Sequence, residues 1–177
     1  MKKFIFAILI LTTSQAALAQ YMFSPSVSYL DRELNDNSNP AASSNLSIID
    51  MKLGYIFDMG LYIGALYSLI DDEITSDSSD FHFGPSIGYY NSGFFVSGTF
   101  YIFGERDLAA GNTKYADVSG FQLDFAYAVP INKTLSIGPQ ITYHKVKYSD
   151  AQVSGLSSPT SYEWKGITPY AALFVNF

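Results

Sequence analysis

Three side chains with catalytic potential share one face of a single predicted strand. Asp80 and His82 are two positions apart, a spacing that permits an acid–base pair, and Ser86 follows four positions after His82. At the usual rise per residue, Ser86 is roughly 13 Å from His82, too far for the imidazole to activate its hydroxyl directly. The spacing therefore does not favour catalysis, and we predict that the protein is not an enzyme.

The sequence offers few ligands for a metal or cofactor. The second histidine, His144, lies on a predicted strand that is not adjacent to the strand of His82, and the chain has no cysteine. Two isolated imidazoles make a poor metal site, and without cysteine there are no thiolate ligands, disulfides or thiol nucleophiles. We expect no catalytic residues, no metal and no cofactor.

These residues belong to a chain with an unusual composition. Of 177 residues, 15% are charged and 16% are aromatic, whereas soluble domains carry about 25% charged residues. The net charge of −6 excludes the basic surface that nucleic-acid binding requires. Many aromatic residues with few charges indicate strands that face something other than water.

The first 19 residues have the features of a secretory signal peptide. Lys2 and Lys3 precede an apolar run at 4–11, and Ala17-Leu18-Ala19 forms a small-x-small cleavage site. The run is much shorter than the roughly 20 residues that a transmembrane helix needs. We predict export, cleavage after Ala19, and one domain over 20–177.

After position 20, large apolar residues alternate with small or polar ones. On the polar side Gly, Ser, Thr, Ala and Gln predominate, where the water-facing side of a soluble sheet would be rich in Lys, Glu and Arg. Large residues toward lipid and small polar residues toward a confined interior are typical of a transmembrane β-barrel, whose closure pairs every backbone group. Eight segments show the pattern: 23–29, 49–57, 61–69, 81–89, 96–102, 120–129, 135–144 and 166–177.

The predicted connections alternate between short and long. We therefore predict an all-β fold, an eight-stranded antiparallel barrel with up-and-down topology, in which periplasmic turns alternate with extracellular loops and both termini are periplasmic. The tight turns are at 58–60, 91–93 and 131–133, and the long polar connections are at about 35–45, 71–79, 104–116 and 149–162.

Five polar residues are predicted to point into the lumen: Arg32, Asp50, Lys52, Gln122 and Asp124. A barrel of eight strands is just narrow enough for side chains to fill it. Unpaired buried charges are costly, so we expect Lys52 to pair with Asp50 or Asp124 in a network that plugs the barrel. A narrow polar pore is the alternative.

Two features depart from the regular pattern. Phe95, Tyr101 and Phe103 would lie on an inward face, so either a β-bulge returns them to lipid or they line an apolar rim pocket that a hydrophobic ligand enters. In addition, four prolines that lack a ladder donor fall inside predicted strands, where they mark bulges or strand ends. They are Pro25, Pro85, Pro139 and Pro169.

The last segment, 170–177, ends on Phe177 with Val175 and Leu173 two and four positions before it. It resembles the C-terminal signal by which the barrel-assembly machinery recognises outer-membrane barrels. The chain as a whole resembles the small eight-stranded outer-membrane barrels of the OmpA transmembrane domain, OmpX and OmpW types. This resemblance implies a monomer in the outer membrane of a Gram-negative bacterium, in contact with lipid and lipopolysaccharide.

Three functions follow from this resemblance. The first is a structural or surface-interaction barrel with a plugged lumen, and the second is a narrow channel for small or hydrophobic solutes. The third is an enzyme that modifies lipid A. The deacylase type of that enzyme carries a His-x-Ser pair, which is missing here because Phe83-Gly84 follows His82 and Lys145-Val146 follows His144.

Overall fold

The computed structural model describes residues 20–34, 42–73, 78–108, 113–153 and 155–177. The predicted signal peptide, 1–19, lies outside these residues, and so does the side chain of Arg32 within the first strand. Strands and turns make up the described chain, which contains no helix long and apolar enough to cross a membrane.

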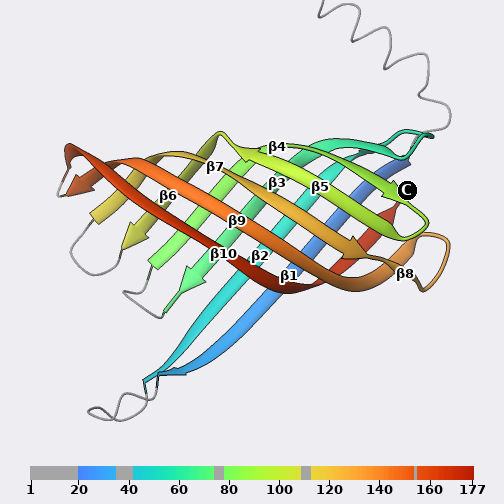
Figure 1. Ribbon diagram of the computed structural model, residues 1–177, viewed down its shortest axis with the longest axis horizontal. Helices are drawn as coiled ribbons and strands as arrows, with labels where there is room; N and C mark the ends of the chain where they lie inside the picture. Colours follow the sequence, from blue (N-terminus) through green and yellow to red (C-terminus); the bar gives the residue numbers. More distant parts are fainter. Residues whose placement is uncertain (1–19, 35–41, 74–77, 109–112, 154) are drawn as a thin grey trace, which may run out of the picture.

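The strands form a closed antiparallel ring (Figure 1). Two strands of the ring are each divided into two segments, because β5 is continued by β6 and β7 by β8. Strand β10 pairs back with β1, so the described residues form a ring of 8 strands, which confirms the predicted barrel. The strands are β1 (Gln20–Leu34), β2 (Ala42–Ile56), β3 (Leu61–Asp72), β4 (Ser78–Asn91), β5 (Phe94–Tyr101), β6 (Phe103–Leu108), β7 (Thr113–Tyr127), β8 (Val129–Pro130), β9 (Leu135–Val153) and β10 (Leu156–Asn176).

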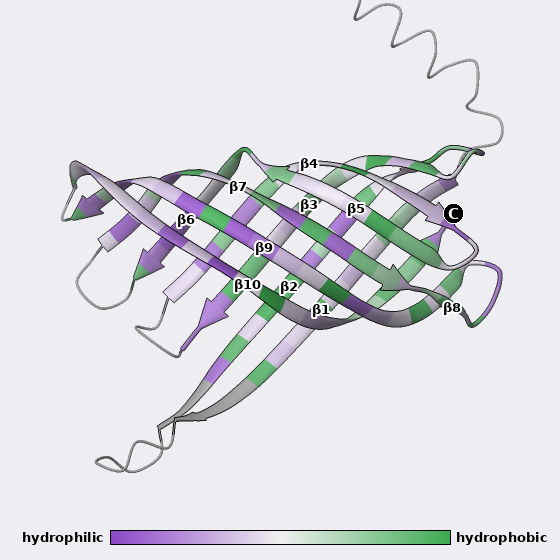
Figure 2. Cartoon of the chain, viewed as in Figure 1, coloured by the Kyte–Doolittle hydropathy of each residue, from purple (hydrophilic) through white to green (hydrophobic). Residues whose placement is uncertain are grey.

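The two faces of the wall follow the predicted alternation. On β7, Leu123 and Phe125 point outward and are 39% and 55% exposed, whereas Gln122 and Asp124 point inward and are fully buried. Hydrophilic and hydrophobic residues accordingly alternate along the strands in Figure 2. The outward apolar residues form a band around the barrel, here called the apolar belt, which ends at Tyr29, Ile49, Leu69, Phe81, Phe103, Phe121, Tyr143 and Ile167.

One end of the barrel, here called the turn end, holds the three predicted tight turns. The β4–β5 hairpin turns through Ser92 and Gly93, whose φ angles of 50° and 89° match the positive values that a two-residue type I′ turn requires. In the third turn, the Asn132 side-chain oxygen accepts hydrogen bonds from the backbone N–H groups of Thr134 and Leu135, both at 2.9 Å. At this end the backbone of Phe177 is hydrogen-bonded to that of Tyr21 on β1.

The opposite end, here called the hairpin end, differs from the prediction. Strands β6 and β7 occupy most of 104–116, and β9 and β10 continue to Val153 and from Leu156, so the loops predicted at 104–116 and 149–162 are largely paired strands. Beyond the apolar belt the outward residues become polar, and the alternation that marks a strand disappears from the sequence. The backbone groups still require partners, and the ladder continues.

Each of the four prolines lies beside an interruption in the sheet. Pro85 pairs with Ala65 on β3, but on its other side the ladder breaks between Ser86 and Phe83, where β5 gives way to β6. Pro139 lies at the break between β7 and β8. Proline has no N–H to donate, so it is tolerated where a ladder is already interrupted.

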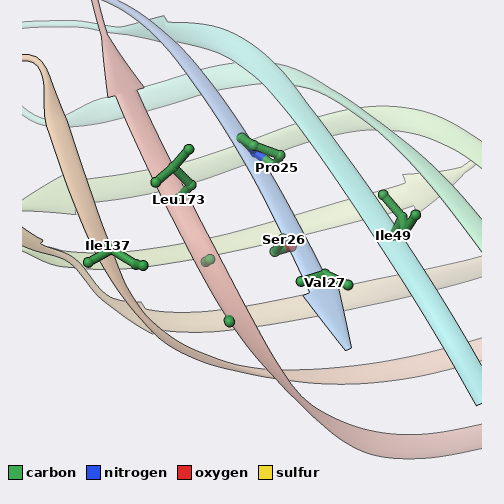
Figure 3. Close-up of a pocket in the computed structure, with 8 residues that line it drawn as sticks. Pro25, Ser26, Val27, Ile49, Ile137 and Leu173 are labelled. Carbon is green, nitrogen blue, oxygen red and sulfur yellow. The ribbon is translucent and has the colours of Figure 1, made fainter. Parts of the chain in front are cut away.

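Pro25 and Pro169 lie at the seam between β1 and β10. Strand β1 pairs with β2 along its whole length, but with β10 only between Met22 and Val27. Beyond Val27 the β1–β2 hairpin turns away from β10, so the wall is split toward the hairpin end (Figure 1). On the outer side of the paired part, Pro25, Val27 and Leu173 border an apolar groove of about 310 Å³ (Figure 3).

Candidate functional site in the barrel lumen

Apolar and aromatic side chains fill the lumen at the turn end. Phe95 is fully buried and lies between Tyr62 and Phe174, with ring centroids 5.3 Å and 5.8 Å away. Tight packing of this kind leaves little room for water. These residues, here called the aromatic plug, are Met22, Ile56, Tyr62, Phe95, Ala126, Ala128, Ala172 and Phe174.

A charged network follows the plug along the same strands. Lys52 Nζ lies 3.4 Å from Asp124 and 4.0 Å from Asp50, and all three side chains are fully buried. Gln122 Nε2 donates to Asp50 at 2.7 Å and to Asp124 at 2.8 Å, so it links the two carboxylates. The structure therefore brings four of the five predicted lumen residues together, around a buried lysine.

The two carboxylates of this Lys52 network are not equally satisfied. Asp124 also accepts hydrogen bonds from Ser97, Gln140 and Thr142, at 2.8 to 3.1 Å. Asp50 Oδ1, in contrast, is buried without a hydrogen-bond partner. With one lysine for two aspartates, the formal charge of the network is negative, and hydrogen bonds to Asp124 offset part of the cost of burying it.

Histidine and tyrosine side chains form the next layer. His82 Nε2 is hydrogen-bonded to the Tyr148 hydroxyl at 2.6 Å, and His144 Nε2 to the Tyr170 hydroxyl at 3.1 Å. The Tyr101 hydroxyl donates to Gln122 Oε1 at 2.6 Å and thereby joins this layer to the Lys52 network. Within the described residues, no three His, Asp or Glu side chains are grouped to hold a metal ion.

A second ion cluster lies nearer the hairpin end. Arg106 is 3.3 Å from Asp80 and 3.8 Å from Asp72, and it donates to Ser78 Oγ at 2.9 Å. Its guanidinium also lies over the Tyr162 ring, 5.0 Å from the centroid. The cluster ties β3, β4, β6 and β10 together across the lumen.

The residues with catalytic potential each have a different nearest partner. Asp80 pairs with Arg106, His82 with Tyr148, and Ser86 with Thr99 at 2.6 Å. Tyr148 also interacts with Asp80, so Asp80 and His82 share this neighbour, whereas Ser86 contacts Thr99.

The three residues considered for a rim pocket are also separated. Phe95 belongs to the aromatic plug at the turn end, and Tyr101 lies in the histidine–tyrosine layer. Between the pairs Ser86–Thr99 and Phe83–Phe103, the β5–β6 wall has one more residue than β4. This bulge turns Phe103 outward, where it is 63% exposed, so the three side chains do not form one pocket.

The bulge also explains why the alternation in the sequence does not predict that Arg106 points inward. Unbroken alternation from Ser97 would place Glu105 inward and Arg106 outward, and the extra residue reverses both. Gln140, Thr142 and His144 follow the regular alternation of β9, so their inward direction could be read from the sequence, but their contacts with Asp124 and Tyr170 could not.

The residues of the proposed C-terminal signal lie at the β1–β10 seam. Leu173, Val175 and Phe177 alternate with the plug residues Ala172 and Phe174 and point to the outside of the barrel. Phe177 is 64% exposed, and its ring stacks on Tyr21 with centroids 6.0 Å apart.

Comparison with known proteins identifies the fold. The crystal structure of Neisserial surface protein A, an eight-stranded outer-membrane β-barrel, matches with a TM-score of 0.57 at 12% sequence identity, over 90% of this chain and 99% of that one. The β domain of the Bordetella autotransporter BrkA, 11% identical over 90% and 98% of the two chains, has a TM-score of only 0.29. No family model and no curated protein matches the sequence. The first likeness shows that the chain shares the barrel fold of the Neisserial protein.

Proposed function

We propose that the protein is an integral outer-membrane barrel with a structural or surface-interaction role and a lumen plugged by its own side chains. Two observations support residence in the membrane: the likeness to an outer-membrane barrel and the continuous apolar belt. Such a belt is suited to lipid, and where β1 pairs with β10, between Met22 and Val27, the closed ring satisfies the backbone groups that lipid cannot.

The filling of the lumen carries the proposal. The aromatic plug and the Lys52 network succeed one another along the barrel, and their side chains are between 0% and 8% exposed. A permeating solute would have to displace an apolar layer and a hydrogen-bonded charged layer. In this proposal the lumen stabilises the barrel, and interactions with other molecules take place on its surface.

The same proposal assigns the barrel an orientation in the outer membrane and a set of partners. The turn end, with both ends of the barrel domain, faces the periplasm, and the hairpin end faces the exterior and lipopolysaccharide. The outward residues Leu173, Val175 and Phe177 at the seam are accessible to the barrel-assembly machinery. The protein acts as a monomer and catalyses no reaction.

Single-channel conductance in a planar bilayer tests the proposal, after a heat-modifiability gel has shown that the refolded protein is a barrel. We expect no steady conductance from the wild type. A steady conductance that Ser97→Trp abolishes would contradict the plugged lumen and support a narrow channel, because Ser97 is buried in the lumen. The outward-facing Val96→Trp is the matched control, since Val96 is 43% exposed on the same strand.

A further inference from the structure

A small cavity of about 140 Å³ lies in the lumen toward the hairpin end. Leu46, Ile48 and Ile70 form an aliphatic wall on β2 and β3, and Tyr162 and Trp164 form an aromatic wall on β10. The Arg106 cluster borders the cavity. This cavity, here called the mouth pocket, lies outside both the aromatic plug and the Lys52 network.

Two residues that line the mouth pocket have a hydrogen-bond donor without an acceptor. Trp164 Nε1 and Arg106 Nε are both buried without an acceptor. The Arg106 side chain is only 7% exposed, and an unsatisfied buried donor of this kind is unfavourable. An acceptor oxygen brought into the pocket would relieve that cost.

The charges around the pocket disfavour an anion. Arg106 is already shared between Asp72 and Asp80, so the cluster has more carboxylates than cations. A second anion would meet the field of these carboxylates in a poorly hydrated site. The aliphatic wall in turn accepts an alkyl chain, and the ligand that fits is therefore uncharged and amphiphilic.

The split in the barrel wall lies beside this pocket. Strand β10 supplies Tyr162, Trp164 and Thr168 to its lining, and over this stretch β10 pairs with β9 and not with β1. The apolar belt ends close by, at Ile167. With the hairpin end facing the exterior, as in the proposed function on which this step rests, a molecule in the outer leaflet meets the free edge of β10 at the level of the pocket.

We propose that the mouth pocket binds a neutral amphiphile. Its alkyl chain lies against Leu46, Ile48 and Ile70. An uncharged hydroxyl or ester oxygen of the same molecule accepts a hydrogen bond from Trp164 Nε1 or Arg106 Nε. Two sources share this chemistry, a membrane lipid entering through the split and a water-borne solute. The proposal is independent of whether the lumen conducts.

Trp164 is the only tryptophan of the chain, so its fluorescence reports on this pocket. The first probe is a bromine-tipped undecyl alcohol, added to the protein in unbrominated phosphatidylcholine vesicles. We expect saturable quenching, at least about fivefold tighter than that by the corresponding carboxylate at about pH 9, where the carboxylate is ionised. The second arm uses vesicles of phosphatidylcholine brominated on its acyl chains, without the alcohol. Quenching there identifies the lipid as the source, and quenching by the alcohol alone identifies a solute.

Neighbouring residues on one strand provide the control. Ile48 is 1% exposed and lines the pocket, whereas Ile49 is 43% exposed on the outside. We expect Ile48→Phe to abolish saturable quenching and Ile49→Phe to preserve it. If Ile48→Phe fails the heat-modifiability test, Leu46→Phe replaces it.

Partition of the alcohol into the membrane is measured separately, with the double variant Trp164→Phe/Phe125→Trp, whose indole faces lipid. Its quenching should rise without saturating. Three results would overturn the proposal: quenching of Trp164 that also fails to saturate, equal quenching by alcohol and carboxylate, or quenching that the pocket-filling variant leaves unchanged.

Discussion

The turn end and the hairpin end of this barrel are built differently. At the turn end the ring is closed between β1 and β10, and the lumen holds the apolar side chains of the aromatic plug. At the hairpin end the same two strands separate, and Arg106, Asp72 and Asp80 form an ion cluster beside a cavity. One sequence thus combines a closed apolar end with an open polar one.

The two ends differ in the interactions that stabilise them. Buried apolar contacts are strong and are not screened by salt, whereas the ions of the hairpin end include the partly exposed Asp72 and the exposed pair Lys145–Glu163, which contribute less. We therefore expect the turn end to hold the barrel together and the hairpin end to tolerate change. Substitutions made in pairs, one at each end, test this comparison.

The largest effect is expected at the centre of the plug. Phe95→Ala removes a fully buried ring that contacts Tyr62 and Phe174, and it should lower the free energy of unfolding by about 4 kcal/mol, since the remaining aromatic rings cannot close the cavity. Tyr162→Ala, in the half-buried cluster of the hairpin end, should cost about 1 kcal/mol. Urea unfolding in lipid vesicles measures both, and equal losses would remove the distinction between the two ends.

The next effect concerns the two buried cations. Lys52→Met leaves Asp50 and Asp124 buried without a counter-ion, and we expect a loss of about 3 kcal/mol. Adding Asp50→Asn should restore part of that stability, because Asp124 keeps four other donors.

Arg106→Met is the matched change at the hairpin end. It should cost about 2 kcal/mol, because Asp80 is 1% exposed and loses its counter-ion, whereas Asp72 is 20% exposed and water can solvate it. Unfolding titrations of the three variants provide the measurement. A loss for Arg106→Met as large as that for Lys52→Met would show that both ends depend equally on buried charge.

The apolar belt distinguishes the two ends on the outside of the barrel. Phe125→Arg places a charge in the belt and should reduce the stability of the folded state in vesicles by about 2 kcal/mol. Ser119→Arg lies beyond the belt on the same strand and should change it by less than about 1 kcal/mol. Similar losses would mean that the belt does not contact lipid.

The sequence was sufficient to predict which residues face inward along most of the wall. The alternation around Gln122 and Asp124 is regular, and a position on the inner face of a narrow barrel almost determines burial. It was also sufficient to bring Lys52 close to Asp124, although which carboxylate it approaches more closely depends on the stagger of the strands.

The features that could not be predicted from the sequence are places where the backbone is irregular. One extra residue between β5 and β6 reverses the direction of Phe103 and Arg106, and the sequence offered a bulge in this segment only as one of two alternatives, without its position. The separation of β1 from β10 beyond Val27 cannot be predicted from the sequence either, because pairing between the first and last strands depends on the curvature of the whole ring. Pro25, Pro85, Pro139 and Pro169 were the available signal, since each lies beside an interruption in the sheet.

The smallest effect is expected for the exposed ion pair of the hairpin end. Lys145 and Glu163 lie on β9 and β10 beyond the apolar belt, 3.5 Å apart and each about 40% exposed. Water and salt screen such a pair, so a double-mutant cycle with Lys145→Ala and Glu163→Ala should give a coupling energy below about 1 kcal/mol. The coupling should fall further in high salt, whereas the loss caused by Phe95→Ala should not. A coupling that matches the loss for Lys52→Met and resists salt would mean that this end is shielded from water, contrary to the comparison.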